Sequence, residues 1–297
     1  MTAPRAVTPD PIRIPLVPPQ PGFEDFISAW FLPGPPACLI DPGPAATVEA
    51  LFAALSGLGV RRIDCCLLTH IHLDHAGGIG QVARRLPEAR IVCHPKAVAH
   101  LADPARLWEG SRKVLGALAD VYGPVEAVPA ERLIPADRFA LEGIVPLLTP
   151  GHAPHHVSFV VGEVLFAGEA CGVVFDLGAH GLYMRPATPP VFALNRAIES
   201  LERLIALRPG RMVVGHTGLY ADGAGLLRRH REQLLAWERL VAEDPQRPAA
   251  AWAEEILRRD PLLAGFGAFS PAAQERERYF LGNSLAGVLG WAASRRG

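Results

Sequence analysis

Short apolar runs alternate with segments of helical periodicity along the first two thirds of the chain. Runs of strand length lie at 12–17, 26–32, 37–40, 63–68, 91–93, 144–148, 157–161, 164–167 and 211–214. Uninterrupted apolar runs of this length are typical of strands that are buried on both faces. Helical periodicity marks residues 48–58, 79–86, 97–101 and 112–122. This alternation favours an α/β fold in which helices flank a sheet.

The pattern changes near residue 220. Beyond it, the segments 225–242, 248–259 and 270–291 are helical in pattern and carry few strand signals. A chain of 297 residues is long enough for one large domain with an appendage. We therefore expect a main domain over residues 1–220 and a helical C-terminal extension over residues 221–297 that packs on it.

Metal-capable side chains gather in the run from Thr69 to His75, directly behind the apolar segment 63–68. On an extended backbone alternate residues point the same way, so His70 and His72 can face one ion. Asp74 and His75 follow after the chain begins to turn, so they can face a different point. The spacing therefore predicts two neighbouring ions rather than one.

The same arrangement recurs further along the chain, where apolar segments lead into His152, Glu169 and His216. Four times a hydrophobic strand delivers a metal-capable side chain at its C-terminal end. Imidazole and carboxylate ligands suit zinc, which we expect, and also suit iron and manganese. We therefore expect two divalent metal ions as cofactors.

Composition narrows the function classes. Hydrophobic residues make up 49% of the chain and charged residues 20%, as in a globular protein. The formal net charge of -1 gives no reason to expect nucleic acid or an anionic membrane as partner. No apolar run reaches the roughly eighteen residues of a membrane span. We expect a small-molecule substrate and leave a homodimer open.

The N-terminal segment and the cysteines indicate a reducing compartment. Residues 1–21 are rich in proline and lack the apolar core of a signal peptide. The five cysteines, an odd number without a C-x-x-C pair, lie in apolar contexts, which favours buried thiols over disulfides. Cys171, two residues from Glu169, is likewise expected to be a buried thiol and not a ligand or nucleophile. We expect a cytoplasmic protein.

Several polar residues near these motifs allow two interpretations. Asp41 is either a turn residue or a carboxylate that orients a ligand histidine. His155 lies three residues past His152, where it either contacts the substrate or has no part in binding it. His156 precedes an apolar strand, where packing or hydrogen bonding is expected. His94 and His100 lie outside any ligand-spaced group and are expected to be structural.

The segment 181–190 follows the strand of Glu169 and is rich in turn formers. It is either a surface loop with one buried tyrosine or a wall of the substrate pocket. In the second case Tyr183 would donate a hydrogen bond to a carbonyl oxygen, and Arg185 would bind an acidic substituent. The loops between the helices at 97–101 and 112–122 are a candidate for another wall.

Five motifs together resemble the metallo-β-lactamase-fold superfamily, and most of all its glyoxalase II and lactonase-like members. They are Leu39–Gly43, Thr69–His75, Thr149–His152, Phe166–Glu169 and Gly215–His216, and they follow the order of the family over about residues 12–220. The resemblance implies an αββα sandwich with the metals at one edge of two facing sheets.

The resemblance also implies a ligand set, carried over by position. His70, His72 and His152 would hold the first ion, and Asp74, His75 and His216 the second. Glu169 would bridge the two. The chain departs from the family at this position, where aspartate is usual. The additional methylene could lengthen the metal–metal distance or turn the bridge into a contact with one metal.

The function that follows is a dinuclear metal-dependent hydrolase acting on a small ester, lactone or thioester. Two ions would lower the pKa of a bridging water towards about 7, which yields a hydroxide nucleophile. Asp74 would orient it and carry a proton. Two alternatives remain: an iron-dependent oxidoreductase of the same fold, similar to persulfide dioxygenases, and a metal-binding scaffold without catalysis.

Overall fold

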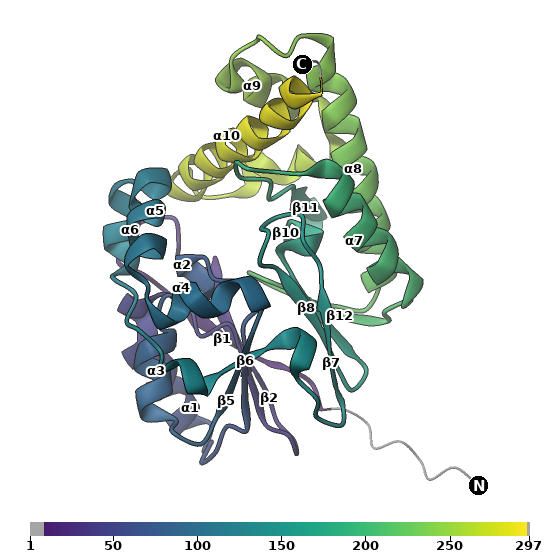
Figure 1. Cartoon of the computed structure of the whole chain (residues 1–297). Coiled ribbons are helices and arrows are strands. Elements are labelled where there is room, and N and C mark those ends of the chain that lie inside the picture. The colour runs from purple at the N-terminus through teal and green to yellow at the C-terminus, as the bar shows by residue number, and fades with distance from the viewer. Residues whose placement is uncertain (1–8, 296–297) are drawn as a thin grey trace, which may run out of the picture.

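Two β-sheets face each other in the computed structural model, which describes residues 9–295 (Figure 1). The first sheet has the strand order β1-β2-β3-β4-β5-β6, and the second has the order β13-β12-β9-β8-β7. The strands of the first sheet are β1 (Ile12–Leu16), β2 (Ile27–Leu32), β3 (Cys38–Ile40), β4 (Cys65–Leu67), β5 (Arg90–Cys93) and β6 (Leu133–Pro135). Those of the second are β7 (Ile144–Leu148), β8 (Val157–Val161), β9 (Val164–Gly168), β12 (Arg211–Val214) and β13 (Leu219–Tyr220). A separate antiparallel hairpin consists of β10 (Val173–Asp176) and β11 (Leu182–Arg185).

Helices cover the outer faces of both sheets. In Figure 1, α1 and α3 lie outside the first sheet and α7 and α8 lie on the side of the second. Before residue 210 the helices are α1 (Val48–Gly57), α2 (Leu73–Ala76), α3 (Ile79–Arg85), α4 (Val98–Ala102), α5 (Ala105–Leu115), α6 (Ala117–Tyr122) and α7 (Leu194–Ala206). The later helices are α8 (Gly223–Glu243), α9 (Ala249–Arg259) and α10 (Pro271–Ser294). This arrangement confirms the αββα sandwich with C-terminal helices.

Strand β4 explains how the sandwich holds the ligand run. Its alternate residues point to opposite faces, so Cys65 and Leu67 join the layer between the two sheets, where Phe166 of β9 also packs. Cys66 and the following Leu68 instead pack toward the helices outside the first sheet. All five side chains are buried. The support immediately before His70 is therefore fixed on both sides, as the apolar run predicted.

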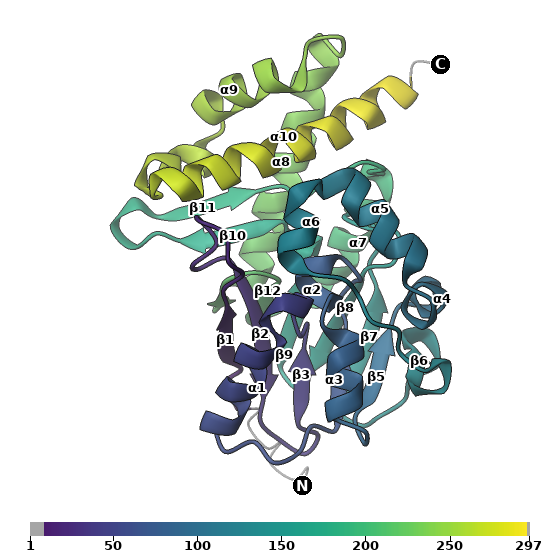
Figure 2. The ribbon, with the colours of Figure 1, turned by 90° about the vertical axis from the view of Figure 1, so that its left-hand side faces the viewer.

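The C-terminal helices lie across one end of the sandwich, next to the hairpin of β10 and β11 (Figure 2). Their buried side chains, among them Leu227, Trp252 and Leu285, belong to the same hydrophobic cluster as the core between the first sheet and its helices. The division into two domains at residue 220 stays a prediction. None of the described helices is both long enough and apolar enough to cross a membrane.

Three local predictions differ from the structure. The helix expected at 112–122 is two helices, α5 and α6, because Gly116 between them has φ 58°, in the left-handed region that favours glycine. The segment expected as turn-rich at 181–190 begins as β11, paired with β10. Helix α7 was not predicted. Residues 1–8, part of the segment expected to lack a signal peptide, lie outside the described residues.

Candidate metal centre

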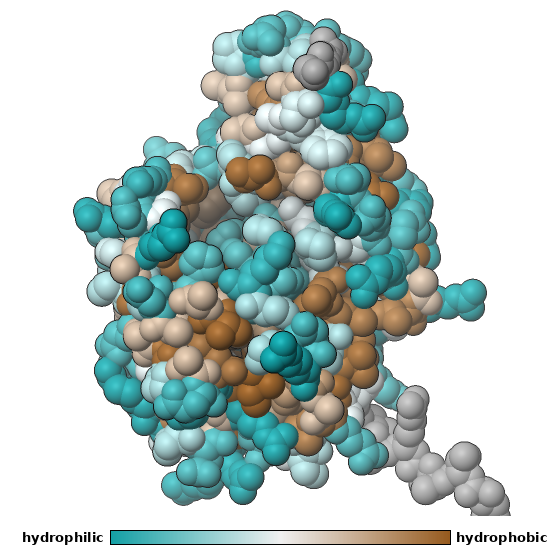
Figure 3. Space-filling view, viewed as in Figure 1, coloured by the Kyte–Doolittle hydropathy of each residue, from teal (hydrophilic) through white to brown (hydrophobic). Residues whose placement is uncertain are grey.

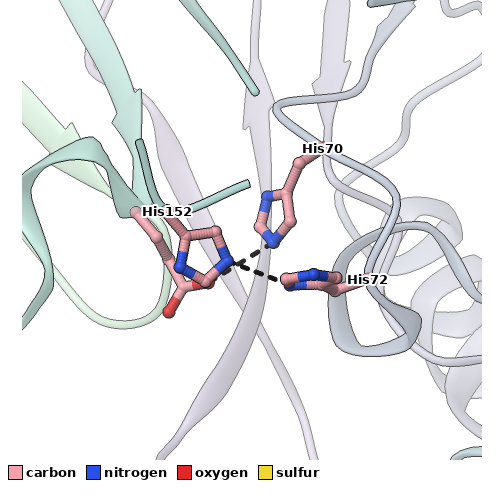
Figure 4. Close-up of side chains that lie close together, drawn as sticks. His70, His72 and His152 are labelled. Atoms are coloured by element: carbon pink, nitrogen blue, oxygen red, sulfur yellow. Dashed lines mark hydrogen bonds and ion pairs between the residues drawn. The ribbon is translucent and has the colours of Figure 1, made fainter. Parts of the chain in front are cut away.

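The first group of metal-capable side chains forms where β4 and β7 end. His70 follows β4, and His72 is the last extended residue before α2, with φ -64° and ψ 154°. His152 comes from the loop after β7 and places its Nε2 2.9 Å from Nδ1 of His72. Figure 4 shows the three imidazoles pointing toward one another. One ligand atom from each, together with a carboxylate oxygen of Glu169, lies within 4.8 Å of every other.

A second group lies beside the first. Asp74 and His75 are carried by α2, which begins directly after His72, and His216 follows β12. One ligand atom from each of the three residues lies within 4.8 Å of the other two. The turn into α2 directs these side chains to a different point from His70, which is the arrangement that the spacing predicted.

Glu169 lies between the two groups. Its Oε2 is 2.8 Å from Nε2 of His152 and 3.7 Å from Nε2 of His75, and its Oε1 is 3.1 Å from Nε2 of His216. One carboxylate therefore contacts histidines of both groups. This is the geometry that a bridging ligand requires, although the side chain is one methylene longer than the usual aspartate.

A buried histidine fixes the backbone of Glu169. Nε2 of His156 accepts a hydrogen bond from the Glu169 amide at 3.1 Å, and its Nδ1 lies 2.9 Å from Oγ1 of Thr149. A Cβ at Gly168, which has φ 56°, would lie 2.5 Å from that Nε2. His156 thus has the hydrogen-bonding role expected for it, and only glycine fits the position before Glu169.

The unpartnered atoms of the site fit divalent ions. Nε2 of His70 and Nε2 of His75 are both buried and have no hydrogen-bond partner. Buried polar atoms nearly always have a partner, so such atoms call for an explanation. Both nitrogens face Oε2 of Glu169, at 3.3 and 3.7 Å. Imidazole lone pairs aimed at the same point as a carboxylate are a donor set for a divalent cation, and the residues fit that group.

The protonation states of His70, His72 and Glu169 agree with this donor set. Burial lowers the pKa of His70 well below 6.5 and lowers that of His72 to about 4, so both rings are neutral and can bind a cation. Burial alone would raise the pKa of Glu169, but the charge and hydrogen bond of His152, with bonds from other histidines, hold it well below 4.5. The carboxylate is therefore charged at neutral pH.

Asp41 combines both interpretations that the sequence allowed. It lies after β3 with φ 51°, as a turn residue, and its Oδ2 is 3.0 Å from Nδ1 of His75. Burial would lower the pKa of His75, but the charges of Asp74 and Asp41 outweigh it and raise the pKa to about 9. Asp41 therefore orients a histidine of the second group, as a carboxylate behind a metal ligand does.

Both groups form the floor of a cavity of about 380 Å³. Its walls are largely apolar and come from α5, from the loop before α7 and from α10. They include Leu107, Val114, Leu115, Val191 and Phe280. In the space-filling view, hydrophobic atoms border the notch between the α5–α6 region and the C-terminal helices (Figure 3). The α5 wall falls in the region that the sequence suggested.

The predicted substrate contacts divide into two kinds. His155 lines the cavity, and its buried Nδ1 has no hydrogen-bond partner. Arg185 also borders the cavity, but its Nε already donates to Glu277 at 2.7 Å. For Tyr183 the structure matches the other interpretation, a buried tyrosine: its side chain is fully buried and does not line the cavity, and its hydroxyl donates to Glu277 at 3.0 Å.

Three further residues meet the cavity although the sequence gave them no such role. His100, expected to be structural, lies exposed at its mouth together with Arg106. Tyr122 lies inside it. The one signal that pointed to them was their place in the segment proposed as a cleft wall. The five cysteines are all buried free thiols, as expected.

Comparison with known proteins gives the same picture as the site. The sequence model of the metallo-beta-lactamase superfamily matches residues 23–216. A metallo-beta-lactamase fold-containing protein of Sulfurisphaera tokodaii is 32% identical over 188 residues, which cover 60% of this chain and 69% of that protein. A hydroxyacylglutathione hydrolase of Stenotrophomonas maltophilia is 30% identical over 206 residues, 68% of this chain. That match spans 65% of the hydrolase, a little less than two thirds of its length.

The fold is also shared with a solved structure over almost its full length. An archaeal metallo-beta-lactamase superfamily protein from Sulfolobus tokodaii has a TM-score of 0.71 and 25% sequence identity. The alignment covers 94% of this chain and 97% of that one, so it includes the C-terminal helices. The chain belongs to the metallo-β-lactamase superfamily.

Proposed function

We propose that this chain is a metal-dependent hydrolase that cleaves a small ester, lactone or thioester at the floor of its cavity. The observation that carries the proposal is the position of Glu169, which contacts histidines of both ligand groups directly below an open pocket. Membership of a superfamily of mostly metal-dependent hydrolases supports it. So does the similarity to a protein named as a hydrolase of hydroxyacylglutathione.

The chain's own residues would prepare the reaction in three ways. Neutral His70 and His72 offer lone pairs, and Glu169 offers negative charge, so the floor can hold cations. Divalent ions bound there would lower the pKa of a water molecule and polarise the scissile carbonyl. Asp74 borders the cavity with Oδ2 3.8 Å from Nε2 of His75. We assign it to orient the attacking water and to take up its proton.

The walls favour a substrate with an apolar substituent. Val114 and Val191, both of which line the cavity, are large aliphatic residues with exposed fractions of 56% and 96%. A volume of about 380 Å³ lies in the range of small-molecule pockets. Arg106 and His100 at the mouth would favour an acidic group on the part of the substrate that extends outward.

The test is metal content and turnover in matched variants. The protein purified without added metal should contain about two metal equivalents per chain, as expected of a dinuclear site. His72→Ala should lose activity at least about 100-fold on p-nitrophenyl butyrate, a butyryl thioester or a γ-lactone, because one ligand of the first group is missing. His180→Ala is the control, because it removes an exposed histidine between β10 and β11 that does not line the cavity.

Three outcomes would contradict the proposal. Full activity of His72→Ala would show that hydrolysis does not use the first group. Thiol-dependent oxygen uptake by the iron-loaded protein, without hydrolysis, would favour the oxidoreductase alternative. No hydrolysis of any ester, lactone or thioester with both metals bound would favour a scaffold.

A further inference from the structure

Tyr122 is a buried residue that lines the cavity. It is the last residue of α6, and Gly123 with φ 84° ends the helix behind it. Helix α6 packs against α2, which carries Asp74. The tyrosine side chain is 1% exposed and borders the cavity. Its place is therefore fixed by packing, over the second ligand group.

The hydroxyl of Tyr122 is buried and has no hydrogen-bond partner. Its surroundings are aromatic: the ring of Phe23 meets the tyrosine edge-on at 6.2 Å, and Phe26 stacks on His216 at 4.2 Å between centroids. Phe280 lies against both phenylalanines and also borders the cavity. None of these phenylalanines offers an acceptor, so the hydroxyl lacks the partner that buried polar groups nearly always have.

Tyr183 shows that the same fold provides a partner where the hydroxyl is structural. It is buried to the same degree, and its hydroxyl donates to Glu277 at 3.0 Å. The two tyrosines differ in one further respect, because Tyr122 borders the cavity and Tyr183 does not. Tyr122 thus combines an unpartnered donor with a place at the wall of the cavity.

Burial and nearby negative charge keep the Tyr122 hydroxyl in its donor form. Burial first, and then the charges of Asp74 and Glu169, raise its pKa well above 10. The hydroxyl therefore stays protonated at neutral pH. The packing of α6 against α2 places the residue on the side of the cavity that holds Asp74.

We propose that Tyr122 is a substrate-binding residue whose hydroxyl donates a hydrogen bond to the acyl oxygen of the substrate on the Asp74 side of the cavity. The proposal rests on the proposed function in one respect, since it takes the ligand to be an ester, lactone or thioester, or the carboxylate that hydrolysis releases. It makes Tyr122 a specificity residue: a ligand without an acceptor at this point gains nothing from the hydroxyl.

The test uses butyrate as the probe, because a carboxylate has acceptor oxygens and needs no turnover. Its Kd is measured by calorimetry on the metal-loaded full-length protein. Tyr122→Phe should weaken butyrate binding roughly three- to tenfold, the value of one neutral hydrogen bond. Tyr183→Phe removes a buried hydroxyl outside the cavity and should leave the Kd unchanged. Tyr220→Phe, which loses a bond to the Val174 carbonyl at 3.1 Å, is a second control should Tyr183→Phe fold poorly.

Three outcomes would contradict the proposed role of Tyr122 in substrate binding. An unchanged Kd in Tyr122→Phe, or no binding of butyrate to the wild-type protein, would overturn the proposal. So would loss of bound metal from Tyr122→Phe by elemental analysis, because the hydroxyl would then serve the ligand groups. Hydrolysis of p-nitrophenyl butyrate by the same preparations separates the two proposals. If hydrolysis is absent but the Kd still shifts, the proposed function fails and the role of Tyr122 stands.

Discussion

Nδ1 of His75 lies 3.0 Å from Oδ2 of Asp41, a residue 34 positions earlier in the chain, and both side chains are buried. Asp41 also accepts hydrogen bonds from the amide and the hydroxyl of Thr69, at 2.8 and 2.6 Å. The bond occupies one ring nitrogen of His75, so the other, Nε2, is left facing the second ligand group. The turn after β3 thereby orients a ligand that α2 carries.

Asp41→Asn should weaken metal binding mainly at the second group. The amide has nearly the size of the carboxylate but no charge, so it orients His75 less strongly, and residues behind metal ligands typically contribute 10–100-fold in affinity. We expect the variant to keep about one metal equivalent after dialysis against a chelator under conditions in which the wild type keeps about two. Asp64→Asn is the control, because Asp64 also accepts a backbone amide at 2.8 Å, from Ala37, away from both groups. Equal retention in Asp41→Asn would contradict the role of Asp41.

Substitutions of Glu169 should reveal whether one carboxylate serves both groups. Glu169→Gln keeps the size but loses the charge, so both equivalents should dissociate more readily. Glu169→Asp keeps the charge, but its shorter side chain cannot keep both the 2.8 Å contact to His152 and the 3.1 Å contact to His216. Metal retention by elemental analysis should therefore fall in the order wild type, Glu169→Asp, Glu169→Gln. If the glutamine variant retained as much metal as the aspartate variant, charge at this position would not matter.

The ligand groups could be predicted because their signal is local. An apolar strand followed at once by His70, or by Glu169, places the side chain at a strand end, whatever the rest of the chain does. Burial of β4 on both faces was likewise visible in its run of hydrophobic residues. The αββα architecture followed from the alternation of strands and helices and from the resemblance of the motifs.

The substrate side of the cavity could not be predicted in the same way, because its contacts are distant in sequence. Tyr183 and its acceptor Glu277 are 94 positions apart, and nothing near the tyrosine indicates that its hydroxyl is already used. The strand β11 is specified by pairing with β10, not by its own turn-rich composition. Tyr122 could not be identified from the sequence either. Its hydroxyl lacks a hydrogen-bond partner because of how the whole chain packs around it.

Glu277→Gln should destabilise the protein strongly. Glu277 is fully buried on α10 and accepts hydrogen bonds from Arg185 at 2.7 Å, from Arg276 at 3.1 Å and from Tyr183 at 3.0 Å. Burial would raise its pKa, but the two guanidinium groups lower it below 4.5, so the carboxylate is charged. Replacing the carboxylate with a neutral amide leaves two buried guanidinium charges uncompensated. Such a change typically lowers the free energy of unfolding by about 3–5 kcal/mol.

The measurement is the free energy of unfolding in urea, with all variants in the same metal-loaded state. Glu254→Gln is the matched control, because Glu254 forms an exposed ion pair with Arg278, and exposed pairs contribute little. If the free energy of unfolding fell no further in Glu277→Gln than in Glu254→Gln, α10 would be held by its apolar contacts and not by this network.

His230 should make the protein less stable in mild acid. It is buried on α8, its Nδ1 has no hydrogen-bond partner, and burial lowers its pKa from 6.5 to about 4 despite the bond to Gln233. In the unfolded chain His230 binds a proton once the pH falls below 6.5. In the folded protein it does not bind one until about pH 4. Stability contributed by the neutral ring is therefore complete above pH 6.5 and is lost as the pH falls toward 4.

His230→Gln removes this group, so the decline in unfolding free energy between about pH 7.5 and pH 5 should be smaller by about 2 kcal/mol than in the wild type. Other buried histidines, such as His72, contribute equally to both proteins and cancel in the comparison. Urea titrations at several pH values measure the difference, and parallel declines in the two proteins would show that His230 does not resist protonation in the folded state.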